Sequence, residues 1–96
     1  MASLLSDEEL DLALRRVPKW KYDAAGKRIW RAIKCRAFMD GIDLVRDVAE
    51  LAEDHQHHPD IDIRWTTITF SLSTHSEGGL TEKDIDLAVE VDGLVE

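Results

Sequence analysis

The segment 61–74 alternates apolar and polar residues, but the alternation changes phase halfway along. Its apolar positions are first Ile61, Ile63 and Trp65, and afterwards Ile68, Phe70 and Leu72. A regular strand turns successive side chains to opposite faces, so a slip of one residue moves every later side chain to the other face. We therefore expect a bulge or a break in this strand-like segment near Thr66-Thr67.

The first part of the chain predicts a helix followed by a β-hairpin. Ser6 with Glu9 three residues later is a capping box, and the apolar spacing that follows predicts a helix over about 6–16. Apolar positions then alternate from Trp20 to Tyr22 and resume from Arg28 to Ala37. Because the residues between them, 23–26, have turn chemistry, these two runs are typical of a hairpin.

A second helix is predicted over about 40–55. Its apolar stripe is formed by Ile42, Val45, Ala49 and Ala52 and is widened by Leu44, Val48 and Leu51. Pro59 lacks a backbone N–H and disfavours helical geometry at His58, so the helix must end before it. His57 and His58 are therefore expected at or just past a helix C-terminus.

A third helix is predicted from an N-cap at Thr81, with Asp84 three residues later, to an end near Gly93. The acidic residues of this helix are expected to form mostly a solvated face. Asp84 is the exception, because the first turn of the helix places it near the loop that carries His75. Gly78-Gly79 is interpreted as a turn, since it lacks the frameworks of phosphate-binding loops.

The element order α-β-β-α-β-β-α predicts an α+β fold, a four-stranded antiparallel sheet with three helices packed on one face. At 96 residues the chain is expected to be a single domain, 1–96, because two cores would each be too small to fold alone. An open sheet leaves edge strands unpaired, so a homo-oligomer that pairs them is expected.

Charge and composition exclude several function classes. Twenty Asp and Glu against 12 Lys and Arg give a net charge of −8, which disfavours binding to nucleic acid and to anionic membranes. The N-terminal residues lack the cationic region of a signal peptide, and no apolar run is long enough to span a bilayer. The single cysteine, Cys35, is expected to be a buried thiol and favours a reducing cytoplasmic location. The three Trp residues are expected in the core or at an interface.

All four histidines, His55, His57, His58 and His75, fall within 21 residues. Imidazole exchanges protons near working pH, so paired histidines can supply one acid and one base. Glu53 lies four residues before His57, and Asp54 lies four residues before His58, so either carboxylate could orient a ring. His55 is expected on the solvated surface.

Two other interpretations of the histidines remain open. A metal site built from His57, His58, His75 and a carboxylate is disfavoured, because adjacent histidines in an extended segment point apart and no His-x-x-x-His pair is present. His-His-Pro can also be no more than a polar loop that ends a helix.

The spacing of a larger set of residues resembles the pterin-4a-carbinolamine dehydratase family. The set comprises Glu53-x-x-x-His57-His58-Pro59, Trp65, Ser73-Thr74-His75, Gly79-Leu80-Thr81 and Asp84-Ile85-Asp86-Leu87-Ala88. The resemblance covers roughly half of the chain. It implies three helices on a four-stranded antiparallel sheet, assembled as a homodimer or homotetramer. The implied reaction is dehydration of 4a-hydroxytetrahydropterin to quinonoid dihydropterin in pterin cofactor recycling, with a pterin as substrate and without metal or organic cofactor.

The resemblance also implies roles for individual residues. His57 and His75 would be the acid and base, and His58 would bind and polarise the pterin. The residues that would contact the substrate or orient the imidazole rings are Glu53, Pro59, Ser73, Thr74, Ser76 and Asp84. The chain departs from common family residues at Gln56, Ile61, Trp65 and Thr66. These departures concern pocket shape and substrate preference rather than the proton carriers.

The alternative function is a non-catalytic binding module, because dehydratase-like proteins include dimerisation partners of transcription factors and assembly factors for other enzymes. The enzyme interpretation predicts that the three histidines His57, His58 and His75 converge on one pocket. The presence of all three histidines together with Asp84 favours catalysis, since a pure scaffold does not need them. A protein partner fits the acidic surface better than DNA does.

Overall fold

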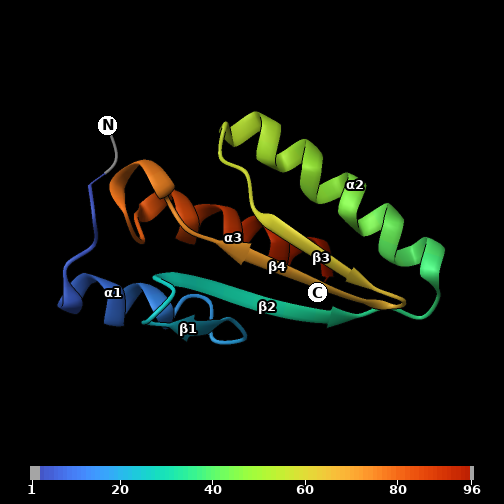
Figure 1. The fold of residues 1–96 in the computed structure, drawn as a ribbon, viewed down its shortest axis with the longest axis horizontal. Coiled ribbons are helices and arrows are strands. Elements are labelled where there is room, and N and C mark those ends of the chain that lie inside the picture. The colour runs from blue at the N-terminus through green and yellow to red at the C-terminus, as the bar shows by residue number, and fades with distance from the viewer. Residues whose placement is uncertain (1–2, 96) are drawn as a thin grey trace.

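The element order of the computed structural model is the predicted α-β-β-α-β-β-α (Figure 1). The structure describes residues 3–95, so residues 1, 2 and 96 of the predicted domain lie outside the described range. The elements are α1 (Asp7–Leu14), β1 (Lys21–Asp23), β2 (Arg28–Lys34), α2 (Phe38–His55), β3 (Asp60–Arg64), β4 (Thr67–Leu72), the 3₁₀ helix η1 (His75–Glu77) and α3 (Glu82–Val95). The predicted α+β fold is confirmed.

The four strands form one antiparallel sheet in the order β1-β2-β4-β3. β3 and β4 are joined by a tight turn at Trp65-Thr66, where Trp65 adopts a left-handed φ of 50°. Ile61 lies directly opposite Phe70, so the two apolar sets share one face of the sheet. The predicted break is therefore confirmed, and the phase change arises because the chain reverses direction at this turn.

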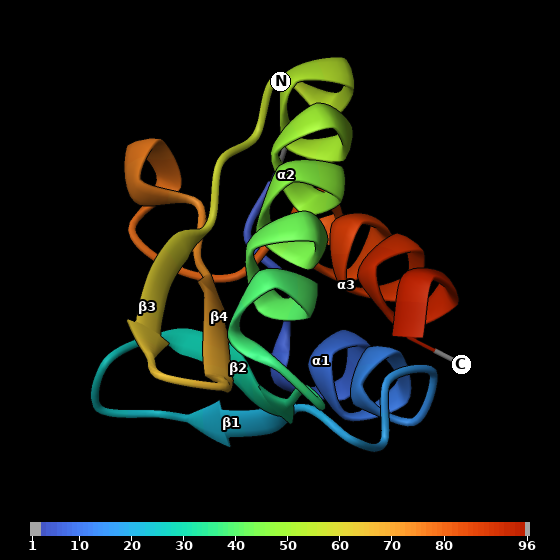
Figure 2. The same cartoon turned by 90° about the vertical axis from the view of Figure 1, so that its right-hand side faces the viewer.

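The three helices cover one face of this sheet, as predicted (Figure 2). α2 approaches β4 closely at Gly41, where a Cβ atom would lie 3.0 Å from Cδ1 of Ile68. The buried residues of α2 are Gly41, Leu44, Val48 and Ala52. The predicted apolar stripe included Ala49, but Ala49 is exposed. The face of α2 that packs on the core is therefore rotated away from Ala49.

The capping box at the start of α1 is confirmed by reciprocal hydrogen bonds between Ser6 and Glu9. α1 is shorter than predicted and ends at Leu14. β1 begins at Lys21, one residue later than predicted.

Three further boundaries differ from the predictions. β2 ends at Lys34 rather than Ala37, because Ala37 is the extended N-cap of α2, and α2 consequently begins at Phe38 rather than at about residue 40. α3 continues through Gly93 to Val95. A glycine inside a helix costs only about 1 kcal/mol, and packing of Val95 against the core offsets it.

Asp92 of α3 is not part of a solvated face as predicted. Its Oδ1 accepts hydrogen bonds from Trp20 Nε1 at 2.8 Å and from Arg31 Nη1 at 2.5 Å. These bonds connect the C-terminal half of α3 to the sheet and to the segment before β1. Trp20 is buried, whereas Trp65 is 75% exposed and is not a core residue. Cys35 is half-buried rather than buried.

Within residues 3–95, no helix combines the length and the apolar character that crossing a membrane requires.

Candidate active site

The C-terminal end of α2 separates the two adjacent histidines. Gln56 ends the helix in the left-handed conformation, with φ 50° and ψ 41°, and the N–H groups of Gln56 and His57 donate to carbonyls of the last turn. Pro59 then prevents helical continuation. As a result His57 is 9% exposed, while His58 is exposed. The expectation that adjacent histidines point apart is confirmed.

His57 is held by the fully buried carboxylate of Asp84. Its Nε2 lies 2.5 Å from Oδ1 of Asp84. The other carboxylate oxygen accepts from the Thr74 hydroxyl at 2.8 Å and from the Thr81 N–H at 2.9 Å. An ionised carboxylate only accepts hydrogen bonds, so His57 donates through Nε2, and in the neutral ring Nδ1 is the basic nitrogen.

The Asp84 carboxylate therefore joins three segments that are distant in sequence: the end of α2, the loop after β4 and the first turn of α3. The predicted proximity of Asp84 to the His75 loop is confirmed by its bond to Thr74, the residue before His75.

His58 has a different carboxylate partner, Glu53, with Nε2 2.5 Å from Oε2. Both side chains are largely exposed, so solvent screens this pair and it contributes little to stability. The four-residue spacing in the sequence places Glu53 beside His57 and Asp54 beside His58 only where the helix continues through both histidines, and here it does not. Spacing by four residues assumes a continuing helix, and the left-handed Gln56 redirects both rings.

The loop after β4 carries the third histidine. Thr74 is buried, and its hydroxyl is bonded to Asp84 and to the Thr81 hydroxyl, so it holds the loop in place. His75 and Ser76 are both in η1 and are both exposed. Ser73 donates from its hydroxyl to the carbonyl of Lys27 at 2.8 Å, which ties this loop to the β1–β2 turn.

These segments gather at one end of the molecule, on the left in Figure 1, where α2 ends, β3 begins, β4 ends and α3 begins. Pro59 lies between His58 and the first residue of β3. His55 is half-buried rather than solvated, and its Nε2 is 3.6 Å from Glu90 of α3.

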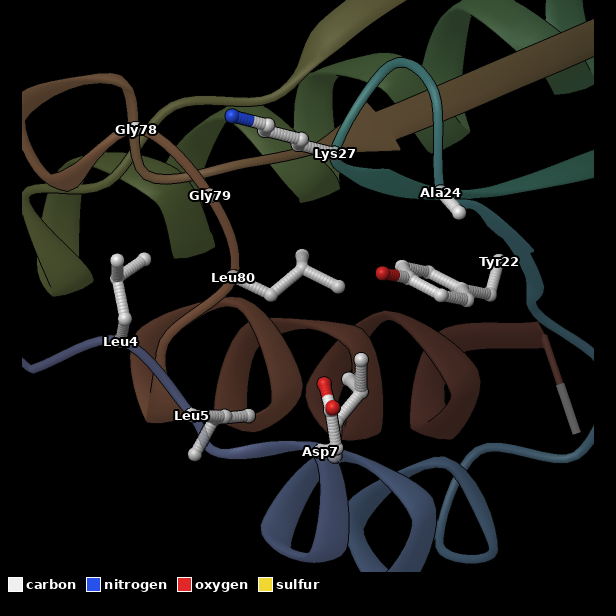
Figure 3. A pocket seen from close by; sticks show the side chains of 10 residues that line it. Leu4, Leu5, Asp7, Tyr22, Ala24, Lys27, Gly78, Gly79 and Leu80 are labelled. Carbon is white, nitrogen blue, oxygen red and sulfur yellow. The ribbon is translucent and has the colours of Figure 1, made fainter.

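Two hollows lie near this end of the molecule. One, of about 250 Å³, lies between the N-terminal segment, the β1–β2 turn and the Gly78-Gly79 loop, and the Lys27 side chain extends across it toward Gly78 (Figure 3). The other, of about 350 Å³, is lined by Arg28, Asp60, Ile61, Asp62, Thr69 and Ser71. Neither wall contains a histidine. The predicted convergence of His57, His58 and His75 on one pocket is therefore not seen in these two hollows.

Arg28 and Asp60, which line the second hollow, are not among the candidate residues from the sequence. Arg28 stands at the start of a predicted strand, and Asp60 follows His-His-Pro directly. A signal for Asp60 existed, because alternation along β3 places it on the face opposite to Ile61.

The part of the chain that the structure describes contains no group of three His, Cys, Asp or Glu side chains arranged to hold a metal ion.

The fold and the site together define a class of small α+β proteins in which a His-His-Pro segment follows the central helix and a buried aspartate of the last helix holds one of the histidines. A family model described as pterin 4 alpha carbinolamine dehydratase matches residues 3–94. The chain therefore belongs to the pterin-4a-carbinolamine dehydratase family, which confirms the resemblance found in the sequence.

Individual relatives agree with this assignment. The chain is 52% identical over 93 residues to a Mycolicibacterium vanbaalenii protein, covering 97% of this chain and 98% of that relative. It is 51% identical over 92 residues to a Mycobacterium bovis protein, covering 96% of each. Both are named as pterin-4-alpha-carbinolamine dehydratases, an activity that their names leave unproven.

Solved structures share the fold. A Brucella melitensis protein described as a transcriptional coactivator/pterin dehydratase matches with a TM-score of 0.91 and 29% identity, covering 96% of this chain and 98% of that one. A pterin dehydratase-like protein described as a RuBisCO assembly factor in the alpha-carboxysome matches with a TM-score of 0.67 and 19% identity, over 79% and 88% of the two chains. The second match concerns the fold alone.

Proposed function

We propose that this protein is a dehydratase that converts 4a-hydroxytetrahydropterin to quinonoid dihydropterin and water, in the recycling of an oxidised pterin. The observation that carries the proposal is the buried Asp84–His57 pair at the end of α2, beside the exposed His58 and the loop of His75. A ring whose proton position is fixed by a buried carboxylate is suited to acid–base chemistry.

The reaction needs two proton transfers. The bond between C4a and its hydroxyl oxygen breaks, and the oxygen leaves with the electron pair and takes a proton from an acid to become water. A base removes the proton on N5, and the N5 electrons form the C4a=N5 double bond. Proton transfer by positioned side chains accelerates such steps by about 10²–10⁴-fold.

We assign these two transfers to His57 and His75, and we assign binding and polarisation of the pterin to the exposed His58. Glu53 orients His58, and Asp84 orients His57. Thr74 acts through Asp84 rather than by contact with substrate, because its hydroxyl is buried and bonded to that carboxylate. Pro59, Ser73 and Ser76 remain the proposed substrate-contacting residues around these histidines.

The assay is stopped mixing of freshly generated 4a-hydroxytetrahydropterin with wild type, His57→Ala and His75→Ala, followed by ultraviolet absorbance. We expect rapid dehydration by the wild type and a loss of about 10²-fold or more in each variant. Undiminished dehydration in both variants would contradict the assignment of the proton transfers to His57 and His75. If the folded wild-type protein does not accelerate dehydration, the proposed dehydratase activity is wrong.

A second candidate function is a protein-binding module, as the descriptions of the two solved relatives suggest for those proteins. The observation that favours it here is the edge strand β3, whose Ile61 and Ile63 are 37% and 42% exposed. Such an edge can pair with a second copy of the chain or with another protein. We propose a homodimer or homotetramer in a reducing cytoplasm as the working form, and sedimentation of the pure protein tests the assembly.

A further inference from the structure

The hollow of about 250 Å³ between the N-terminal segment, the β1–β2 turn and the Gly78-Gly79 loop has walls that are held by hydrogen bonds. The Leu5 N–H donates to the Leu80 carbonyl at 3.0 Å, which fixes the N-terminal segment to the start of α3. The Lys27 carbonyl accepts from the Ser73 hydroxyl at 2.8 Å, which fixes the β1–β2 turn to the loop after β4. The hollow is therefore preformed, as ligand sites usually are.

The floor of this hollow is apolar. Leu80 is 6% exposed, and its side chain lies in the middle of the hollow in Figure 3. Leu5 and Leu10, which pack against the core, also line the hollow. The ring of Tyr22 forms one side, with its hydroxyl directed toward Leu80 (Figure 3). The volume lies below the range that is typical for drug-sized ligands, so the hollow suits a small molecule with an apolar body.

Lys27 contributes a free positive charge to the hollow. The residue adopts a left-handed conformation, with φ 53°, which glycine adopts without strain and other residues rarely adopt. Its side chain extends across the hollow (Figure 3), and its ammonium makes no hydrogen bond or ion pair with any residue from 3 to 95. No contact of this ammonium in the described fold offsets the strain, and backbone outliers of this kind cluster at ligand sites.

Asp7, the first residue of α1, is the other charged side chain among the described residues that line the hollow. Its carboxylate also makes no hydrogen bond or ion pair with any residue from 3 to 95. In Figure 3 it lies on the side of Leu80 that is opposite to Lys27. The hollow therefore presents a free cation and a free anion on either side of an apolar floor.

These charges select among the possible classes of ligand. A simple anion would be attracted by Lys27 but repelled by Asp7 and by the net charge of −8. A simple cation would be attracted by Asp7 but repelled by Lys27. A molecule with both charges, one at each end of an apolar chain, satisfies both residues and covers Leu80.

We infer that this hollow binds a small zwitterion whose carboxylate and ammonium are separated by an apolar body. Lys27 binds the carboxylate, Asp7 binds the ammonium, and Leu80 contacts the apolar body. The inference is independent of the proposed dehydration, because none of the residues assigned to that reaction lines the hollow.

The test uses 6-aminohexanoate as the probe and the full-length protein at low ionic strength. Hexanoate lacks the ammonium, hexylamine lacks the carboxylate, and the isomer 2-aminohexanoate carries both charges at one end. Binding is followed by the backbone amide signals in heteronuclear NMR spectra, which report weak binding and also where on the protein it occurs.

Two variants with matched controls separate the two charges. Lys27→Gln removes the positive charge and keeps a Cβ atom in the same turn, with Lys21→Gln on β1 as the control outside the hollow. Asp7→Asn removes the negative charge from the first turn of α1, with Asp40→Asn in the first turn of α2 as the control.

We expect 6-aminohexanoate to shift the amide signals of Gly78, Gly79 and Leu80 to saturation. Its Kd should be about fivefold lower than the Kd of each of the other three compounds, because an exposed ion pair contributes up to about 1 kcal/mol. Lys27→Gln should raise the Kd of 6-aminohexanoate about fivefold without raising that of hexylamine. Asp7→Asn should do the same without raising the Kd of hexanoate, and both control variants should bind like wild type.

The absence of saturable shifts at these three amides would overturn the inference. So would equal Kd values for 6-aminohexanoate and its single-charge analogues, or equal Kd values in wild type and Lys27→Gln. Tighter binding of 2-aminohexanoate than of 6-aminohexanoate would overturn the separation of the two charges. None of these results depends on whether the protein accelerates dehydration, so the two proposals fail separately.

Discussion

Replacing Asp84 with Asn separates the charge of this residue from its shape. The carboxylate accepts three hydrogen bonds in a fully buried position, from His57, Thr74 and Thr81. The amide oxygen of Asn can still accept from Thr74 and Thr81, but its NH₂ group then faces His57 Nε2. A donor now meets a donor, so the ring must move its proton to Nδ1 to keep this hydrogen bond.

The magnitude follows from the charge that this hydrogen bond loses. A hydrogen bond to a charged group contributes about 1.5–3 kcal/mol and a neutral one about 0.5–1.5 kcal/mol, so we expect the free energy of unfolding to fall by about 1–2 kcal/mol. The kcat for dehydration should fall by a larger factor than this loss of stability. If His57 transfers a proton through Nδ1, the changed tautomer removes a contribution of about 10²–10⁴-fold to kcat.

Asp92→Asn is the matched control, because Asp92 lies on the same helix and also accepts hydrogen bonds across the fold, from Trp20 and Arg31. Urea unfolding and stopped-flow dehydration are measured for both variants. Asp92→Asn should lose stability and keep kcat. Dehydration by Asp84→Asn within about twofold of wild type would refute the claim that Asp84 acts through the His57 tautomer.

Three further predictions concern stability. Gln56→Gly should raise the free energy of unfolding by about 0.5–1 kcal/mol in urea titrations, because Gln56 occupies a left-handed conformation that glycine adopts without strain. Thr66→Val should leave stability unchanged or raise it by about 1 kcal/mol, since the buried Thr66 hydroxyl has no hydrogen-bond partner among the described residues. Hydrogen bonds from the Gly26 N–H and from Arg28 hold the pKa of Asp23 below its usual value. Ionised Asp23 therefore stabilises the fold above its unfolded pKa, and that contribution is lost as the pH falls through the folded pKa. Asp23→Asn should lower the thermal midpoint at neutral pH and weaken its fall between about pH 5 and pH 3.

Local sequence patterns predicted the elements of this fold well. The Ser6–Glu9 capping box, the proline after α2 and the phase change between Ile63 and Ile68 each act over a few residues, and each marks a real boundary. The ends of elements were less predictable. Whether α3 stops at Gly93 depends on packing against distant side chains, which a local pattern does not contain.

The partners of the histidines were the hardest feature to predict. Spacing by four residues offered Glu53 to His57 only if the helix continued, and the partner in the structure is Asp84, 27 residues away in sequence. One left-handed residue, Gln56, decides this outcome, because it turns His57 into the protein and His58 out of it. Glutamine rarely adopts this conformation, so the sequence carried little sign of it.

The buried Asp84–His57 pair also bears on the choice between an enzyme and a scaffold. Taking a carboxylate out of water costs several kcal/mol, and replacing a buried polar pair with well-packed apolar residues is often neutral or stabilising. Stability alone therefore gives little reason to keep the Asp84–His57 pair rather than two well-packed apolar side chains. Asp92 differs, because it remains partly exposed and its partners are a tryptophan and an arginine rather than a histidine. A fully buried carboxylate whose one aromatic partner is a histidine, and which is also bonded to Thr74 in the His75 loop, is better explained by control of a proton. This reasoning favours catalysis over a purely structural use of the site.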